Sequence, residues 1–275
     1  MSALIRNSVL TEHAIDRRLL VVGGFATLAL SAFLIAPGDI AWKTHMALHG
    51  LCAQRPSHSL QIGGATLPMD ARMTGIYLGA ATTITWLAAA RRFRATRVPS
   101  LPVLVFLASF VVVLGVDGFN ALLVDLRLPT LYAPSNIVRL ASGVLAGTSL
   151  GVAIGHLFAC SLWTHGDREQ AVVMKPAELL APIAVSAVIA ALALSDFSLL
   201  YAPFAVGLLV AAIGIFWLLG IVLIALVTQR GWSCRTWCDL APLALASLIA
   251  AIMSVGALSW LRFAAEQLYG LPKLT

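Results

Sequence analysis

Charged residues are scarce in this chain: they make up 11% of its 275 residues, against about 25% in a typical soluble domain. So little charge cannot cover a water-facing surface, which excludes an ordinary soluble globular protein. Hydrophobic residues make up 60% of the chain, and its mean hydropathy is +0.93. Apolar runs of about 18 residues or more, long enough to cross a bilayer, recur from end to end. We therefore expect an integral membrane protein surrounded by a lipid bilayer.

Cysteine is also rare, and the four present, Cys52, Cys160, Cys234 and Cys238, form no obvious disulfide framework. The net charge of +6 comes from basic residues at the ends of apolar runs, not from a basic patch. This pattern is typical of membrane orientation and argues against nucleic-acid binding. No small-x-small cleavage site follows the first apolar run, so we interpret that run as an uncleaved helix.

The apolar runs predict an all-α fold, a polytopic helical membrane protein with about seven transmembrane helices. The expected spans are residues 19–36, 73–90, 101–123, 138–162, 179–200, 204–228 and 241–263. With the N-terminus inside, most Lys and Arg residues fall in cytoplasmic segments, including the cluster Arg91, Arg92, Arg94 and Arg97. This excess predicts an N-in, C-out orientation. We divide the chain into a four-helix part with a long outer loop (1–170, loop 39–72) and a three-helix extension (171–275).

The long outer loop begins with a stretch that predicts a short helix on the membrane surface. His45, His49 and Cys52 follow one another at spacings of four and three, which places them on one face of such a helix. Imidazole and thiolate suit zinc or copper, so these three residues are a candidate metal site. No Cys-x-x-Cys pair supports it, and the alternative is a surface helix whose cysteine acts as a small hydrophobe.

Polar residues gather at the outer ends of the expected spans and in the loop before them. The candidate ligand-binding residues are Arg55, His58, Asp70, Arg72, Asp117, Asn120, Asn136 and Arg139. Arg55 and His58 could hold a phosphate or carboxylate, or could belong to a loop whose serines satisfy their own backbone. Charges at membrane depth are costly and usually pair or mark a function. Two interpretations stay open: an ion-pair network that fixes helix register, or a polar pocket open to the outer face.

A stripe of glycines runs along the fourth expected span, at Gly143, Gly147, Gly151 and Gly155. Small residues at this spacing let another helix approach closely. Gly75 and Gly79 offer a matching stripe on the second span, and another membrane subunit is the alternative partner. Packing of the second and fourth spans would bring Arg72 near Arg139, so carboxylates or an anionic ligand would then be needed between them.

The best-defined motif is Arg72-Met73-Thr74-Gly75-Ile76-Tyr77. Around it stand His49 to Ser59, Leu67-Pro68, Ala71 to Gly79, Asp117-Gly118, and Asn136 with Arg139 and Gly143. This pattern resembles a bacterial and archaeal membrane family called domain of unknown function 2085, over roughly residues 45–155. The resemblance implies a prokaryotic plasma (inner) membrane protein and brings no established activity. Family members commonly carry a Cys-x-x-Cys pair around this arginine, where Asp70 and Met73 stand here.

Three functions fit these features. The clustered charges favour a polar pocket at the outer face that binds or moves a small anionic or lipid-like ligand. An alternative is an accessory or structural subunit of a larger membrane complex, such as an electron-transfer complex, docked through the glycine stripe or the last three helices. A second alternative is an enzyme acting on lipid or polyprenyl substrates, with His49, His58 or Asp70 as acid or base. No nucleophile–base pair is recognisable, which disfavours an enzyme. A metal ion at His45, His49 and Cys52 is the one cofactor we consider.

Overall fold

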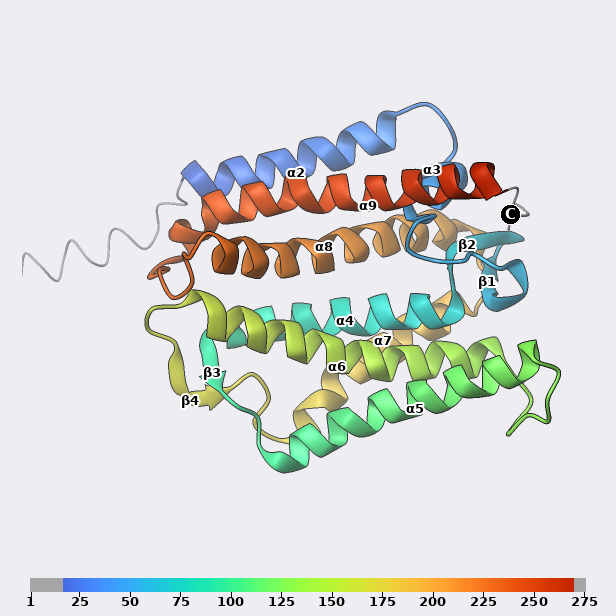
Figure 1. Ribbon diagram of the computed structural model, residues 1–275, viewed down its shortest axis with the longest axis horizontal. Coiled ribbons are helices and arrows are strands. Elements are labelled where there is room, and N and C mark those ends of the chain that lie inside the picture. Colours follow the sequence, from blue (N-terminus) through green and yellow to red (C-terminus); the bar gives the residue numbers. More distant parts are fainter. Residues whose placement is uncertain (1–16, 270–275) are drawn as a thin grey trace, which may run out of the picture.

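The computed structural model describes residues 17–269, and its long helices lie roughly side by side along the longest axis of the molecule (Figure 1). These helices are α2 (Arg17–Ile35), α4 (Ala71–Ala89), α5 (Leu101–Asp125), α6 (Asn136–Leu162), α7 (Leu180–Ala193), α8 (Tyr201–Val227) and α9 (Ala241–Tyr269). Their bounds agree with the expected spans to within a few residues, except that α7 ends early. The chain is thus a mostly helical, multi-pass membrane protein.

The connections between these helices gather at two ends of the bundle (Figure 1). One, which we call the hairpin end, holds α3 (Ile40–Leu48), β1 (Ser59–Ile62) and β2 (Ala65–Asp70). The opposite end, the β3–β4 end, holds β3 (Ala95–Arg97) and β4 (Asp167–Ala171). Short 3-10 turns complete the connections, at Pro56–His58, Arg92–Arg94, Pro176–Leu179, Ser198–Leu200 and Trp237–Leu240. The sequence predicted the short helix of the outer loop, whereas the all-α expectation overlooked the four strands.

Six of the long helices are long and apolar enough to cross a membrane: α2, α5 and α6 directly, and α7, α8 and α9 together with the 3-10 turns before them. The seventh, α4, is not among them, although its 19 residues satisfy the length requirement. Its composition is the reason, since it carries Arg72 and several threonines. Much of α4 is buried against neighbouring helices, so its side chains need not be as apolar as those that face lipid.

The closest packing in the bundle is between α4 and α6, and it depends on glycine. A Cβ added at Gly147 would lie 2.2 Å from the carbonyl oxygen of Ile76, and one at Gly79 would lie 2.2 Å from that of Val144. Gly75 and Gly143 face backbone atoms at 2.3 Å in the same way. The two predicted glycine stripes therefore pack against each other. Within the chain, α4 occupies the surface of α6 at which the alternative would place another subunit.

Helix caps and a glycine turn, both formed by residues close in sequence, shape the hairpin end. Asp39 caps α3 by accepting from the Trp42 amide at 2.7 Å, and Asp70 caps α4 by accepting from the Met73 amide at 2.8 Å. The turn between β1 and β2 has positive φ angles at Gly63 (60°) and Gly64 (77°), which favour glycine. The Gly63 amide also donates to Asp196 in the connection between α7 and α8. The contacts of Asp70 and Gly63 attach the hairpin to the start of α4 and to the connection between α7 and α8.

Candidate functional site

The predicted polar residues of α4 and α5 meet at the hairpin end in one ion pair. Nε and Nη2 of Arg72 donate to Oδ2 of Asp117 at 2.9 and 2.6 Å. Only 4% of the Asp117 surface is exposed, so hydrogen bonds and the ion pair must replace the water that this carboxylate loses on burial. The other partners are the hydroxyls of Tyr132, 2.8 Å from Oδ1, and Ser142, 3.3 Å from Oδ2. The arrangement around Asp117 is that of an ion pair that holds three helices in register.

The connection between α5 and α6 is held by Asn120 and Tyr132. The Asn120 amide accepts from the Leu131 N–H at 2.8 Å and donates to the Tyr132 carbonyl at 3.0 Å. Burial and the hydrogen bond to Asp117 raise the pKa of Tyr132, so its phenol stays protonated and donates to the carboxylate. Asn120 was predicted to bind a ligand, and in the structure both atoms of its amide bind this connection instead.

Arg139, in the first turn of α6, is buried with 7% of its surface exposed. Its Nη1 donates to the side-chain oxygen of Asn136 at 2.8 Å. Asn136 in turn donates from Nδ2 to the carbonyls of Ser57 (3.2 Å) and Ser59 (3.3 Å), which fixes the orientation of its amide. Across residues 17–269, no carboxylate lies within the 4.0 Å ion-pair distance of Arg139. The guanidinium is therefore a buried charge without an anionic partner in the described chain.

The loop candidates Arg55 and His58 lie on the same side as Arg139. Burial, and then the positive charges of Arg139 and Arg55, lower the pKa of His58, so its imidazole is neutral at pH 7. Arg55 makes one loose ion pair, 3.4 Å from Asp125, in which both side chains are about half exposed. Asp70 serves as the cap of α4. Thus Arg139, Arg55 and His58 lie near one another, while Asp70, Arg72 and Asp117 have partners of their own.

The three residues of the predicted metal site have separate partners. His45 Nδ1 lies 2.9 Å from the Ala41 carbonyl, and the Cys52 sulfur accepts from the amides of Gln54 and Asp70. Burial, together with the charge of Asp70, raises the pKa of Cys52 to about 11, so its thiol is protonated at neutral pH in the metal-free chain. Between residues 17 and 269 no three His, Cys, Asp or Glu side chains lie where they could hold a metal ion. The arrangement of these side chains does not support the metal prediction.

His49 instead belongs to a buried network with the last helix, α9. Its Nδ1 lies 2.9 Å from the Gln54 side-chain oxygen, and its Nε2 lies 3.0 Å from the Glu266 carboxylate. Gln54 donates from Nε2 to two backbone carbonyls, so its oxygen must face His49. Both neighbours of the ring therefore present oxygen acceptors to His49.

Arg262 completes this network from one turn earlier on α9. It donates from Nε to Glu266 at 2.9 Å and from Nη1 to the carbonyls of His49 and Cys52. Sequence analysis overlooked Arg262 and Glu266 as partners of this loop. The signal that could have found them is their spacing of four, with opposite charges, inside an otherwise apolar helix.

The segment that contains most of the predicted site residues also matches a known protein family. It runs from Cys52 through the hairpin and α4 to α6, and it contains the Arg72–Asp117 pair and Arg139. Residues 52–154 match DUF2085, a family described as predicted membrane proteins. The resemblance seen in the sequence over residues 45–155 is thereby confirmed. The DUF2085 region ends within α6, so α7, α8 and α9, with Arg262 and Glu266, lie beyond it. Comparison with curated proteins and with solved structures gave no match.

Proposed function

We propose that this membrane protein binds a small anion, or the anionic headgroup of a lipid, at Arg139 on the hairpin end. The observation that carries this proposal is the buried guanidinium without a carboxylate partner. Removing a charge from water costs several kcal/mol unless an opposite charge or a full set of hydrogen bonds replaces the water, and Asn136 supplies one neutral acceptor. An anion on the remaining donors would remove this cost.

The free donors of Arg139 remain within reach of a ligand. None of its nitrogens is among the fully enclosed polar atoms that lack a partner in the described chain. The donors that Asn136 does not use therefore lie at the small exposed part of the side chain. A planar guanidinium offers two parallel N–H groups to a phosphate or carboxylate, and this geometry suits either ligand.

The neighbours of Arg139 fit an anion better than a cation. Arg55 adds a second positive charge. Its ion pair with Asp125 is long and about half exposed, so the Arg55 side chain is held only weakly and can turn toward a ligand. The neutral imidazole of His58 can donate one hydrogen bond without a charge. Arg72 and Asp117 neutralise each other, so we assign the ligand to Arg139, Arg55 and His58, away from that pair.

Substitution of Arg139 by glutamine tests this proposal. In wild-type protein purified in mild detergent, phosphate is expected to raise the temperature of unfolding, and in Arg139→Gln this rise should disappear. The affinity for phosphate should fall about tenfold or more, because a charged hydrogen bond contributes about 1.5–3 kcal/mol. The control is Arg127→Gln, which removes an exposed arginine at the same end of the molecule.

The same measurement of the unfolding temperature distinguishes two possible sources of the anion, a free phosphate and a lipid headgroup. Inorganic phosphate and phosphatidylglycerol in mixed micelles share the phosphate group, and phosphatidylcholine micelles control for the lipid chains. Stabilisation by phosphate alone that is lost in Arg139→Gln indicates a free anion. Stabilisation by phosphatidylglycerol alone that is lost in Arg139→Gln indicates a headgroup. Equal responses of wild type and Arg139→Gln to both would refute the proposal.

We also infer that α4 crosses the membrane as a seventh helix, with the hairpin end on the outer face of a prokaryotic plasma (inner) membrane. Nineteen residues of helix span about 28 Å, close to the thickness of the hydrocarbon layer. Seven crossings connected at alternating ends agree with the positions of the loops in Figure 1. The arginine cluster from Arg91 to Arg97 then lies inside, as basic residues prefer.

Cysteine labelling tests this orientation. A cysteine at the exposed Leu131, in the connection between α5 and α6, should react with a membrane-impermeant maleimide in intact cells. A cysteine at the exposed Glu169, in β4, should react after the membrane is opened. The unsubstituted chain measures the background from its own cysteines. The reverse pattern would contradict the inferred orientation.

A further inference from the structure

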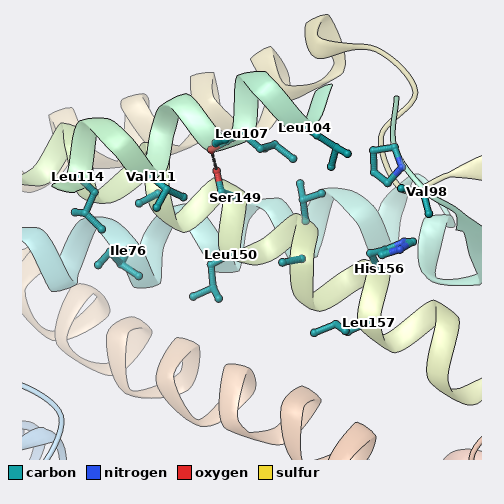
Figure 2. Close-up of a pocket in the computed structure, with 15 residues that line it drawn as sticks. Ile76, Val98, Leu104, Leu107, Val111, Leu114, Ser149, Leu150, His156 and Leu157 are labelled. Atoms are coloured by element: carbon teal, nitrogen blue, oxygen red, sulfur yellow. Dashed lines mark hydrogen bonds between the residues drawn. The ribbon is translucent and has the colours of Figure 1, made fainter. Parts of the chain in front are cut away.

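A groove of about 710 Å³ runs between α5 and α6, at a distance from Arg139 (Figure 2). Leu104, Leu107, Val111 and Leu114 line it from α5, and residues from Ala146 to Leu157 line it from α6. Ile76 of α4 forms part of its floor. Its volume lies within the usual range for a small-molecule site, about 300–1,000 Å³. None of the residues predicted to bind a ligand lines this groove.

The groove is apolar along its length and polar at one end. Of its two polar side chains, Ser149 donates to the Leu107 carbonyl at 2.9 Å and is thereby satisfied. His156 lies at the end of the groove next to Val98 (Figure 2), and its ring nitrogen lies 3.6 Å from the sulfur of Cys160, a weak partner. No aspartate or glutamate lines the groove. The lining thus combines a hydrocarbon-like wall with one available hydrogen-bonding group.

Positive charge also lies at the His156 end. Arg97 directly precedes Val98 and is exposed, and its side chain has no hydrogen bond or ion pair within the described residues. The neighbouring arginines are engaged: Arg92 binds the Ala171 carbonyl, and Arg94 lies over the ring of Trp163. Arg97 is therefore a free cation next to the mouth of the groove. Basic sites of this kind at helix ends attract anionic lipid headgroups.

The opposite end of the groove lies toward the Arg72–Asp117 ion pair. Arg72 lies four residues before Ile76 on α4, and Asp117 lies three residues after Leu114 on α5, so the ion pair stands about one turn beyond these two lining residues. The lining of α6 from Ala146 to His156 extends about 15 Å at 1.5 Å per residue. An apolar groove of this length, bordered by a cation at the His156 end, matches an amphipathic chain with an anionic head.

We propose that this groove holds one acyl chain of an anionic phospholipid, whose phosphate lies between Arg97 and His156. A partner helix fits less well, because a helix with its side chains is about 10 Å across and would fill more than ~1,000 Å³ over this length. The site is separate from the one at Arg139, from which it differs in residues and in membrane level. The two proposals can therefore succeed or fail independently.

The first test fills the groove. Ala153 lines it and is exposed, so Ala153→Trp adds bulk there without entering the core. Ala184→Trp is the matched control, since Ala184 is exposed on α7 and does not line the groove. Full-length protein in mild detergent is titrated with dioleoyl phosphatidylglycerol, and bound lipid is counted by native mass spectrometry. Each chain also carries Arg139→Gln, so that lipid at the proposed anion site is not counted. On this background we expect one tightly bound lipid in the otherwise unchanged chain and in Ala184→Trp, and about tenfold weaker binding in Ala153→Trp, because the acyl chain loses its apolar contacts.

The second test removes the charge at the mouth. Arg97→Gln should weaken the binding of phosphatidylglycerol about fivefold, because one basic residue contributes about 1 kcal/mol to the attraction of an anionic lipid. Binding of dioleoyl phosphatidylcholine, with the same chains and no net charge, should not change. This exposed substitution keeps the proposal testable even if Ala153→Trp fails to fold.

Three results would overturn the proposal. The first is equal binding of the two lipids by wild type, and the second is unchanged lipid binding in folded Ala153→Trp. The third is a quinone, pigment or helical subunit that copurifies with wild type in place of the phospholipid and is lost in Ala153→Trp. Arg139→Gln should retain wild-type lipid binding in this groove, which separates its outcome from that of the anion site.

Discussion

Replacing Gly147 by alanine is expected to lower the free energy of unfolding by about 3 kcal/mol or more, the upper part of the range for overpacked cores. The added methyl would lie 2.2 Å from the Ile76 carbonyl oxygen and 2.9 Å from its Cα. Both obstacles are backbone atoms of α4, so no side-chain rotation can relieve the contact. The two helices must instead move apart, which loses contacts along their whole length. Unfolding in detergent, followed by circular dichroism, measures this change.

Gly115→Ala provides the matched control for this prediction. Gly115 lies inside α5, and a Cβ added there meets nothing within 4 Å. Alanine favours a helix over glycine by about 1 kcal/mol in water, so this variant should be as stable as wild type or slightly more stable. Equal stability of Gly147→Ala and Gly115→Ala would mean that α4 and α6 do not pack through their glycines.

The second large effect is expected at Asp117, the buried carboxylate that receives Arg72, Tyr132 and Ser142. Asp117→Ala should lower the free energy of unfolding by about 3 kcal/mol, because it leaves Arg72 without its anion and takes an acceptor from both hydroxyls. The same unfolding measurement applies. The double variant Arg72→Met/Asp117→Leu should recover most of this loss, since apolar side chains of similar size replace buried ion pairs at little cost.

Asp125→Ala is the control for charge loss at the same end of the molecule. Its pair with Arg55 is 3.4 Å long, with exposures of 45% and 53%, and exposed pairs contribute about 0–1 kcal/mol. This variant should therefore unfold almost as wild type does. If Asp117→Ala were as mild as Asp125→Ala, the Arg72–Asp117 pair would not hold the helices in register.

The helices themselves were largely predictable from the sequence, because the length of an apolar run is a local property. The span expected at 101–123 is α5 (Leu101–Asp125), and the span expected at 138–162 is α6 (Asn136–Leu162). The span expected at 179–200 was less accurate, since α7 ends at Ala193 and a turn precedes α8. Asp196 occupies that turn with a positive φ of 55° and binds the hairpin, a contact that apolar periodicity does not reveal.

The candidate site was predictable only in part. The sequence indicated that Arg72, Asp117 and Arg139 lie at one level, and it left open which arginine pairs with Asp117. The structure pairs Asp117 with Arg72 and leaves Arg139 with Asn136. The prediction for His49 grouped it with its helical neighbours, whereas its strongest partner is Glu266, 217 residues away. Spacing along one helix describes neighbours on that helix and contains no information about a distant segment that packs on it.

The amino-acid sequence by itself determined the membrane environment, the positions of the helices and the surfaces suited to close packing. Scarce charge, apolar runs and glycines at a spacing of four act locally, so each can be interpreted within one segment. The tertiary structure decided which surfaces meet: the glycine stripe of α6 packs against α4, Arg139 has no carboxylate partner among residues 17–269, and α5 and α6 leave a groove between them. Such outcomes depend on the packing of segments far apart in the chain, where the cost of a buried charge or an empty groove is set by neighbours that no local pattern specifies.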